Sequence, residues 1–295
     1  MFRFLKLCIL GILLFSCKNA PEEKNEINLS NEFKEYWFSG EAEITSYALQ
    51  QARYGETREG EAVLIYVTED FLPEAQVKAS TGNEDNISVL KLNATKNFVT
   101  GIYPYSIMQS TFYPLNGEEH ALKVSASIQE WCGQVYMQLN KRENLQIKIH
   151  SYFQGEADQD LELEKFPLEN EVWNKLRTEH RKLPTGEFKM IPSFEYLRLM
   201  HKAVKAYVVT GEYYTNEEFH VYKLSYPQLK RELKIYYTKE FPYTIEKWEE
   251  SYPSGAAENA KILTTKAVKK ERLKTDYWNK NSNKNIPLRE RLELN

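Results

Sequence analysis

No segment of this 295-residue sequence is apolar for long enough to span a bilayer, which takes about 20 residues. The apolar run from Leu7 to Phe15 falls well short of that length. We therefore expect no membrane-spanning helix, and predict a soluble body.

The sequence also has no large excess of charge of one sign. Lysine and arginine number 39, aspartate and glutamate number 42, and the formal net charge is −3. Removal of Arg3 and Lys6 with an N-terminal signal would make the remaining chain more acidic still. Nucleic-acid binding and charge-driven adhesion to anionic membranes both need a basic surface, so both are disfavoured.

Sequence motifs for catalysis or metal binding are missing. The five histidines form neither a His-x-His nor a His-Glu-x-x-His pattern, and the chain has no glycine-rich phosphate loop and no Gly-x-Ser-x-Gly segment. A metal site that combines His180 and His201 with Glu179 or Glu195 stays open as a minor alternative. We predict no catalytic residue, no metal and no cofactor.

What the sequence does contain is the pattern of a bacterial lipoprotein signal. Arg3 and Lys6 precede the apolar run, which ends in Leu-Phe-Ser-Cys at residues 14–17. Lipoprotein maturation needs a cysteine because its thiol accepts a diacylglyceryl group and its amine becomes the acylated N-terminus. We predict a signal peptide over residues 1–16 and lipidation of Cys17; an ordinary secretory signal or a buried N-terminal helix is the alternative.

The polar stretch after Cys17 predicts a flexible lipidated tether over residues 17–32, followed by a single domain over 33–295. Several acyl chains hold a protein stably on a membrane. Lys18 does not resemble an inner-membrane retention signal, so we expect the outer membrane, on its periplasmic or its surface face. With Cys8 removed and Cys17 acylated, Cys132 has no disulfide partner, so stability must come from a hydrophobic core.

Aromatic residues and alternating polarity predict a mainly β fold of the α+β class. The chain has 20 tyrosines, and apolar residues recur at every second position in evenly spaced short segments. Asn116-Gly117 favours a two-residue type I′ turn within a hairpin. The expected strands cover residues 41–49, 61–68, 88–98, 105–113, 120–130, 134–139, 145–153, 204–214, 219–226, 231–238 and 243–250.

Two segments in the middle of the chain favour helices. Residues 168–183 carry apolar side chains three and four apart, and residues 192–201 offer Ser193 as an N-cap or first-turn residue. The acidic stretch 158–164 is expected to be a solvated loop. Together these elements predict a curved antiparallel sheet or half-barrel with one or two helices on its concave face. The strand sets on either side of the helices could be two halves of one sheet.

Cys132 and a group of glutamates could support catalysis, but each has a structural explanation. A nucleophilic Cys132 needs a nearby histidine or a helix N-terminus, and a small buried residue beside Trp131 is the favoured interpretation. A glycosidase needs two carboxylates across a cleft, whereas the early glutamates are expected at solvent-facing strand positions. These glutamates are Glu41, Glu43, Glu56, Glu59 and Glu61.

A group of mostly aromatic residues is the candidate ligand site, because it could line a pocket; core packing is the favoured alternative. We predict a non-catalytic binding or scaffold role, with a lipid or other apolar or amphipathic ligand. A cell-envelope hydrolase acting on glycan or peptide is the alternative. The candidate residues are Tyr103, Tyr105, Glu130, Trp131, Cys132 and Tyr136.

Besides Cys17, four segments of the chain carry a resemblance to a known family: Trp37–Ile44, Gln51–Glu56, Gly101–Ser106 and Gln129–Gly133. Together they resemble a family of uncharacterised lipoproteins of Bacteroidota, some of which carry the label septum formation inhibitor Maf. Maf nucleotide pyrophosphatases open with a Ser-x-Ser-Pro-Arg-Arg loop, which this chain lacks, so the resemblance implies an envelope location and no activity. The order of elements is also similar to the periplasmic lipoprotein-carrier architecture, a curved antiparallel sheet that holds a helix in its mouth.

Overall fold

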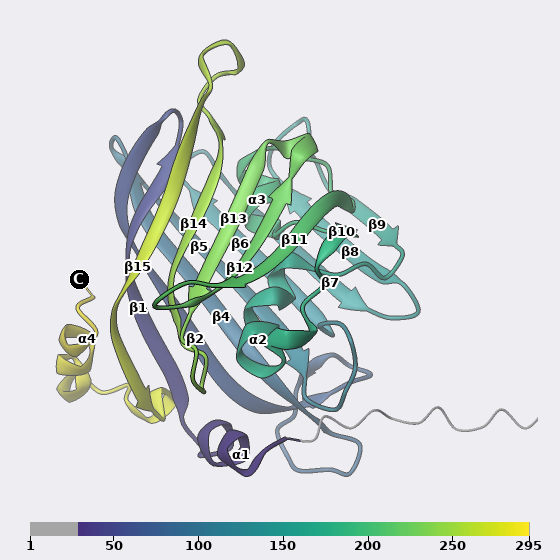
Figure 1. The fold of residues 1–295 in the computed structure, drawn as a ribbon, viewed down its shortest axis with the longest axis vertical. Helices are drawn as coiled ribbons and strands as arrows, with labels where there is room; N and C mark the ends of the chain where they lie inside the picture. Colours follow the sequence, from purple (N-terminus) through teal and green to yellow (C-terminus); the bar gives the residue numbers. More distant parts are fainter. Residues whose placement is uncertain (1–28, 295) are drawn as a thin grey trace, which may run out of the picture.

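The computed structural model describes residues 29–294, so the predicted signal peptide, Cys17 and most of the predicted tether lie outside the described residues. Within this range the chain forms one antiparallel sheet of 15 strands. The sheet curves strongly around a concave face without closing into a barrel (Figure 1). The predicted fold class is therefore confirmed.

The N-terminal strands follow one another as hairpins. Three tight turns, at residues 54–55, 101–102 and 131–132, lie at the same end of the sheet, which we call the rim. Tyr54 and Gly55 have φ angles of 55° and 79°, as a type I′ turn requires. The strands are β1 (Ala42–Arg53), β2 (Glu56–Leu72), β3 (Val77–Lys78), β4 (Ile87–Thr100), β5 (Tyr103–Pro114), β6 (Lys123–Glu130), β7 (Gly133–Lys141), β8 (Leu145–Ser151) and β9 (Gln159–Leu163).

The C-terminal strands complete the same sheet, because β15 lies between β14 and β1. The sequence did not predict β15. Its core-facing side chains near the middle are only Thr265 and Ala267, with Lys266 exposed between them, so no large apolar residue marks the alternation. These strands are β10 (Gly186–Met190), β11 (Tyr207–Thr215), β12 (His220–Tyr226), β13 (Arg231–Tyr237), β14 (Ile245–Ser254) and β15 (Lys261–Thr275).

The helices are α1 (Asn31–Trp37), α2 (Glu169–Thr178), α3 (Phe194–Leu199) and α4 (Pro287–Arg291). Both predicted helices exist, and α2 and α3 lie on the concave face (Figure 1). The hydroxyl oxygen of Ser193 accepts a hydrogen bond from the backbone N–H of Tyr196 at 3.3 Å, so Ser193 caps α3. α1 begins two residues before the predicted start of the domain.

Strand alternation places one side of the sheet in the main core. In β7, Val135, Met137 and Leu139 are buried, whereas Gln134 and Tyr136 between and beside them are exposed. Burial of each such apolar side chain contributes about 1.5–3 kcal/mol relative to its exposure. α2 and α3 cover this concave surface, so the apolar side chains of the helices and of the sheet form one common core.

A second, smaller core lies on the outer face of β1, β2 and β15. It joins Ala42, Ile44, Val67 and Leu273 to Leu292 at the end of α4, so the first half of β1 is buried on both faces. None of the helices within residues 29–294 has the length and apolar character needed to cross a membrane.

Two local predictions are wrong. Asn116-Gly117 is not a two-residue turn, because the connection between β5 and β6 spans residues 115–122 and the Asn116 side chain accepts a hydrogen bond from the N–H of Glu118. The acidic stretch is not a loop but the edge strand β9, which pairs with β8 and packs Leu161 and Leu163 against the core.

Candidate functional site

Two buried arginines are fully paired with carboxylates. Arg177 in α2 places its terminal nitrogens 2.7 and 2.8 Å from the carboxylate oxygens of Glu43 in β1. Arg231 in β13 lies 2.6 Å from oxygens of both Glu169 and Glu250. Such forked contacts balance a buried guanidinium. Because Arg177 and Glu169 belong to α2, the two groups fasten that helix to β1 on one side and to β13 on the other.

The expectation that the early glutamates all face solvent is wrong for Glu43. This side chain is buried beneath α2, where the Tyr36 hydroxyl also donates a hydrogen bond to it. Burial alone would raise the pKa of the Glu43 carboxyl, but the Arg177 guanidinium holds that pKa below its ordinary value. The remaining members, Glu41, Glu56, Glu59 and Glu61, are at least partly exposed.

Arg53, the last residue of β1, is buried without a carboxylate partner of this kind. Within residues 29–294 its guanidinium donates hydrogen bonds to the hydroxyls of Tyr54 and Tyr105, at 3.0 and 3.2 Å, and to the backbone carbonyl of Leu199. Its Nε finds no hydrogen-bond partner among those residues. In the described part of the chain, the hydrogen-bond partners of the Arg53 cation are therefore all neutral groups.

Arg198 in α3 is the second buried arginine without such a partner. Its side chain is 5% exposed, and the nearest carboxylate oxygen, Oε1 of Glu156, lies 3.7 Å from its Nη1. Its Nε has no hydrogen-bond partner in the described part of the chain. The guanidinium lies 4.0 Å above the Phe153 ring. Burial lowers the pKa of Arg198, and the nearby cation of Arg53 acts in the same direction.

A cavity of about 360 Å³ opens beside Arg198. Its volume lies within the range of small-molecule binding sites. One wall is the apolar concave surface of β7 and β8, and the opposite side carries polar groups from α3 and the segments that follow it. An apolar wall with a cationic side chain at one edge can hold an amphipathic molecule. The apolar lining residues are Val135, Met137, Ile149, Leu197, Ala203 and Val204, and the ionisable ones are Glu156, Arg198, His201 and Lys202.

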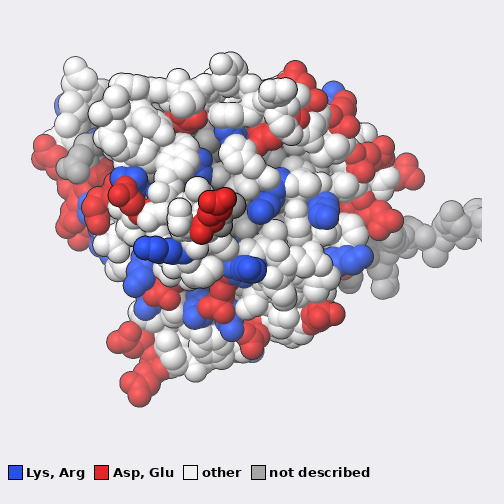
Figure 2. All heavy atoms as spheres, turned by 90° about the horizontal axis from the view of Figure 1, so that it is seen from above, with Lys and Arg blue, Asp and Glu red and all other residues white. Residues whose placement is uncertain are grey.

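The view onto the rim shows how charge is distributed at this end of the molecule. Uncharged side chains cover most of the surface, basic side chains surround its middle, and most acidic side chains lie toward its edges (Figure 2). The hairpin tips here expose large apolar side chains, with Ile102 at 82% and Trp131 at 69% exposure. The rim is therefore a mainly uncharged surface on which basic side chains surround an acidic one near the middle.

Three of the predicted ligand-site residues come together at the rim. The Tyr103 ring centroid lies 6.0 Å from that of Tyr105 and 6.4 Å from that of Trp131, and Tyr105 connects this cluster to Arg53. Glu130 lies at the end of β6, near enough to act on the charge of Arg198. Tyr105 is a core residue, Trp131 is mostly exposed, and the predicted cluster adjoins the 360 Å³ cavity without lining it.

The other two predicted residues lie apart from the site. Tyr136 points outward from the convex face of β7, and its hydroxyl donates a hydrogen bond to Gln138 at 2.7 Å. Cys132 is exposed in the rim turn, so the expectation of a small buried residue is wrong. The Glu130 carboxylate accepts a hydrogen bond from the Cys132 N–H at 2.6 Å and raises the pKa of the thiol. Since the thiolate is the nucleophile, this environment disfavours covalent catalysis.

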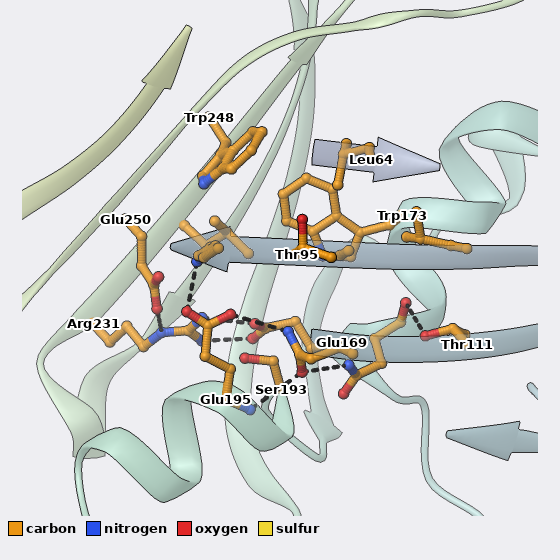
Figure 3. A pocket seen from close by; sticks show the side chains of 16 residues that line it. Leu64, Thr95, Thr111, Glu169, Trp173, Ser193, Glu195, Arg231, Trp248 and Glu250 are labelled. Atoms are coloured by element: carbon orange, nitrogen blue, oxygen red, sulfur yellow. Dashed lines mark hydrogen bonds and ion pairs between the residues drawn. The ribbon is translucent and has the colours of Figure 1, made fainter. Parts of the chain in front are cut away.

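A second cavity, of about 40 Å³, lies deeper in the concave face, where three carboxylates converge (Figure 3). Glu169 and Glu250 bind Arg231, whereas Oε1 of Glu195 lies 2.7 Å from the Lys96 ammonium. Burial raises the pKa of Glu195. The volume suits a few water molecules at most. Because the carboxylates are engaged by cations, we assign this network to the cohesion of α2 and α3 with the sheet.

The histidines suggested for a metal site are not assembled into one. His180 packs 4.2 Å from the Tyr243 ring centroid and 5.7 Å from that of His220, whereas Nδ1 of His201 lies 2.7 Å from Oε1 of Glu156. Residues 29–294 contain no cluster of three or more side chains able to hold a metal ion.

Sequence reasoning missed both arginines that lack a close carboxylate partner. Arg198 lies between Leu197 and Leu199 in a segment recognised as a helix, and the flanking leucines were the available signal that the arginine is buried. The sequence signal for burial of Arg53 was weaker, because this residue precedes a turn and resembles an exposed hairpin residue.

Searches against family models, curated proteins and solved structures find no match to this chain.

Proposed function

We propose that this chain is a lipid-anchored protein of the bacterial envelope whose folded body binds an apolar or amphipathic ligand without catalysing a reaction. The observation that carries the binding role is the 360 Å³ cavity, with an apolar wall on β7 and β8 and the buried Arg198 at its edge. Transfer of an apolar ligand from water onto such a wall is favourable by about 25 cal/mol for each Å² buried.

The position of the first helix is compatible with an anchor at Cys17. α1 lies at the end of the sheet opposite the rim, since β1 runs from Ala42 near α1 to Arg53 at the rim (Figure 1). A tether that joins the body at α1 leaves the rim and the cavity free to meet a ligand. The signal pattern at residues 1–17 remains the main support for the location.

Substitution of Cys17 tests the anchor. We expect Cys17→Ser to abolish incorporation of labelled palmitate and to move the protein from the membrane fraction to the soluble fraction. Cys8→Ser is the control, because Cys8 belongs to the segment that is removed, and this variant should stay in the membrane fraction. Unchanged palmitate labelling of Cys17→Ser would contradict the proposal.

Native mass spectrometry tests the binding role. We expect the soluble form that begins at Lys18 to carry a co-purifying small molecule that organic extraction removes. Val204→Trp fills the cavity and should abolish the added mass, whereas Val268→Trp, at an exposed position on the outer face of β15, should retain it. An added mass that survives in Val204→Trp would place the ligand elsewhere.

The hydrolase alternative is favoured by one observation, the raised pKa of the Glu195 carboxyl beside two other carboxylates. A general acid needs such a proton-holding carboxyl. Against this, the adjoining space is about 40 Å³, and Lys96 and Arg231 bind the carboxylates. A glycan does not fit there without rearrangement, so we prefer the binding role. Turnover of a glycan or peptide that Glu195→Gln abolishes would reverse this preference.

A further inference from the structure

We infer that the ligand of the 360 Å³ cavity is a single-chain amphiphile with an anionic head group, and that Arg198 binds the head group. This inference rests on the proposed binding role and specifies the chemical class of ligand. Its basis is the contrast between two kinds of buried arginine in the same molecule.

The contrast concerns how each buried cation is compensated. Arg177 and Arg231 each have carboxylate oxygens within 2.8 Å, as a buried guanidinium ordinarily requires. Among residues 29–294, Arg198 has none within hydrogen-bond distance, and the neighbouring Arg53 adds a second positive charge whose partners in that range are hydroxyl and carbonyl oxygens. A buried, incompletely paired cation is costly, so an anion from outside the chain would relieve an existing imbalance.

The single carboxylate at the cavity does not remove this imbalance. Oε1 of Glu156 lies 2.7 Å from Nδ1 of His201 and 3.7 Å from Nη1 of Arg198, so its close contact is with the histidine. Lys202 lines the same cavity and contributes another cation. The charges that face the cavity therefore favour an anionic head group over a neutral or cationic one.

The geometry also fixes where the head group and the chain lie. Stacking on Phe153 holds the flat face of the Arg198 guanidinium. Because the unpartnered Nε is buried, the terminal nitrogens at the edge of the group are the donors that can reach a ligand in the cavity. Carboxylates and phosphates both accept such forked donors. The chain then lies along the wall formed by Val135, Met137 and Ile149.

Calorimetric titration with three probes of equal chain length tests the inference. The soluble form beginning at Lys18 is suitable, because residues 29–294 contain the whole sheet and its core. We expect decanoate, decyl phosphate or both to bind at least about tenfold more tightly than decanol. Arg198→Met should weaken binding of the anions by about tenfold to hundredfold and leave decanol unchanged. Preference for one anion identifies the head group as a carboxylate or a phosphate.

Two further variants make the result decisive. Arg142→Met, in the turn between β7 and β8 at the end of the sheet opposite the rim, is the matched control and should bind like the parent protein. Arg198→Lys keeps the charge and should retain part of the preference for anions, and it replaces Arg198→Met if that variant does not fold. Equal affinity for decanol and the anions, unaffected by Arg198→Met, would overturn the anionic head group while leaving the binding role intact. Failure of all three probes to bind would overturn both.

Discussion

At the residue scale, buried charges determine both the stability of the fold and the character of the cavity. Arg177 and Arg231 are matched by carboxylates and connect α2 to opposite parts of the sheet. Arg53 and Arg198 lack that match and lie at the rim. We therefore expect different consequences of substitution. Loss of an ion pair at Arg177 or Arg231 should lower the stability of the fold, whereas substitution of Arg198 should weaken ligand binding.

Glu43→Gln tests the structural role of the first kind of pair. The amide cannot balance the Arg177 charge, and removal of one partner of a buried ion pair costs about 3–5 kcal/mol. We expect the urea midpoint to fall accordingly, with little change in the slope of the transition. Glu56→Gln, which removes an exposed partner of Arg58, should cost less than about 1 kcal/mol. Equal effects of the two substitutions would show that the buried pair has no special role.

His180 gives the fold a dependence on pH. Burial, with His220 and Arg181 nearby, lowers the pKa of His180 from 6.5 to about 4. The unfolded chain therefore binds a proton more readily than the folded one, and the contribution of His180 to stability is present above pH 6.5 and lost as the pH falls toward 4. We expect His180→Gln to reduce the loss of unfolding free energy over this interval by about 2 kcal/mol. His150→Gln, at an exposed position, is the control variant, and an equal change in both variants would contradict the assignment to His180.

At the scale of elements, the sequence predicted those with strong patterns and missed those without them. The alternation in β7 and in β13, and the cap at Ser193, are local signals that the fold respects. β15 carries small core residues between lysines, and β9 carries acidic residues at every second position, so tertiary pairing rather than local pattern makes them strands. The prediction of a two-residue turn at Asn116-Gly117 was wrong because side-chain and backbone hydrogen bonds stabilise a longer connection between the strands.

The close approach of β2 and β4 provides a test at this scale. A Cβ atom at Gly60 would lie 2.3 Å from the backbone oxygen of Asn97 and 2.8 Å from the Cβ of Phe98. Because β4 cannot shift without disturbing its pairing with β5, we expect Gly60→Ala to lower the unfolding free energy by about 1–3 kcal/mol. Gly82→Ala, where a Cβ meets nothing within 4 Å, is the control. Thermal unfolding of the two variants measures the difference, and a stable Gly60→Ala would contradict the close packing.

At the scale of the whole molecule, the cavity results from the curvature of the sheet. β7 and β8 are distant in sequence from α3, and the curvature of the sheet brings these elements together (Figure 1), so that Met137, Ile149 and Arg198 line one cavity. No local sequence pattern indicates that these elements lie close together, so the cavity could not be predicted from the sequence. The adjoining aromatic cluster at Tyr103 and Trp131 could be, because its residues belong to recognisable sequence segments. The cluster and the cavity share one end of the sheet, so both fit a ligand that enters at the rim.

On our proposal, the concave side of this sheet holds an amphiphile. A crystal structure of the protein purified from its native envelope would reveal this molecule. We expect elongated electron density in the cavity, with its polar end beside Arg198 and its apolar end against Met137 and Ile149. A cavity closed by its own side chains, or one that contains only separate water molecules, would contradict the account.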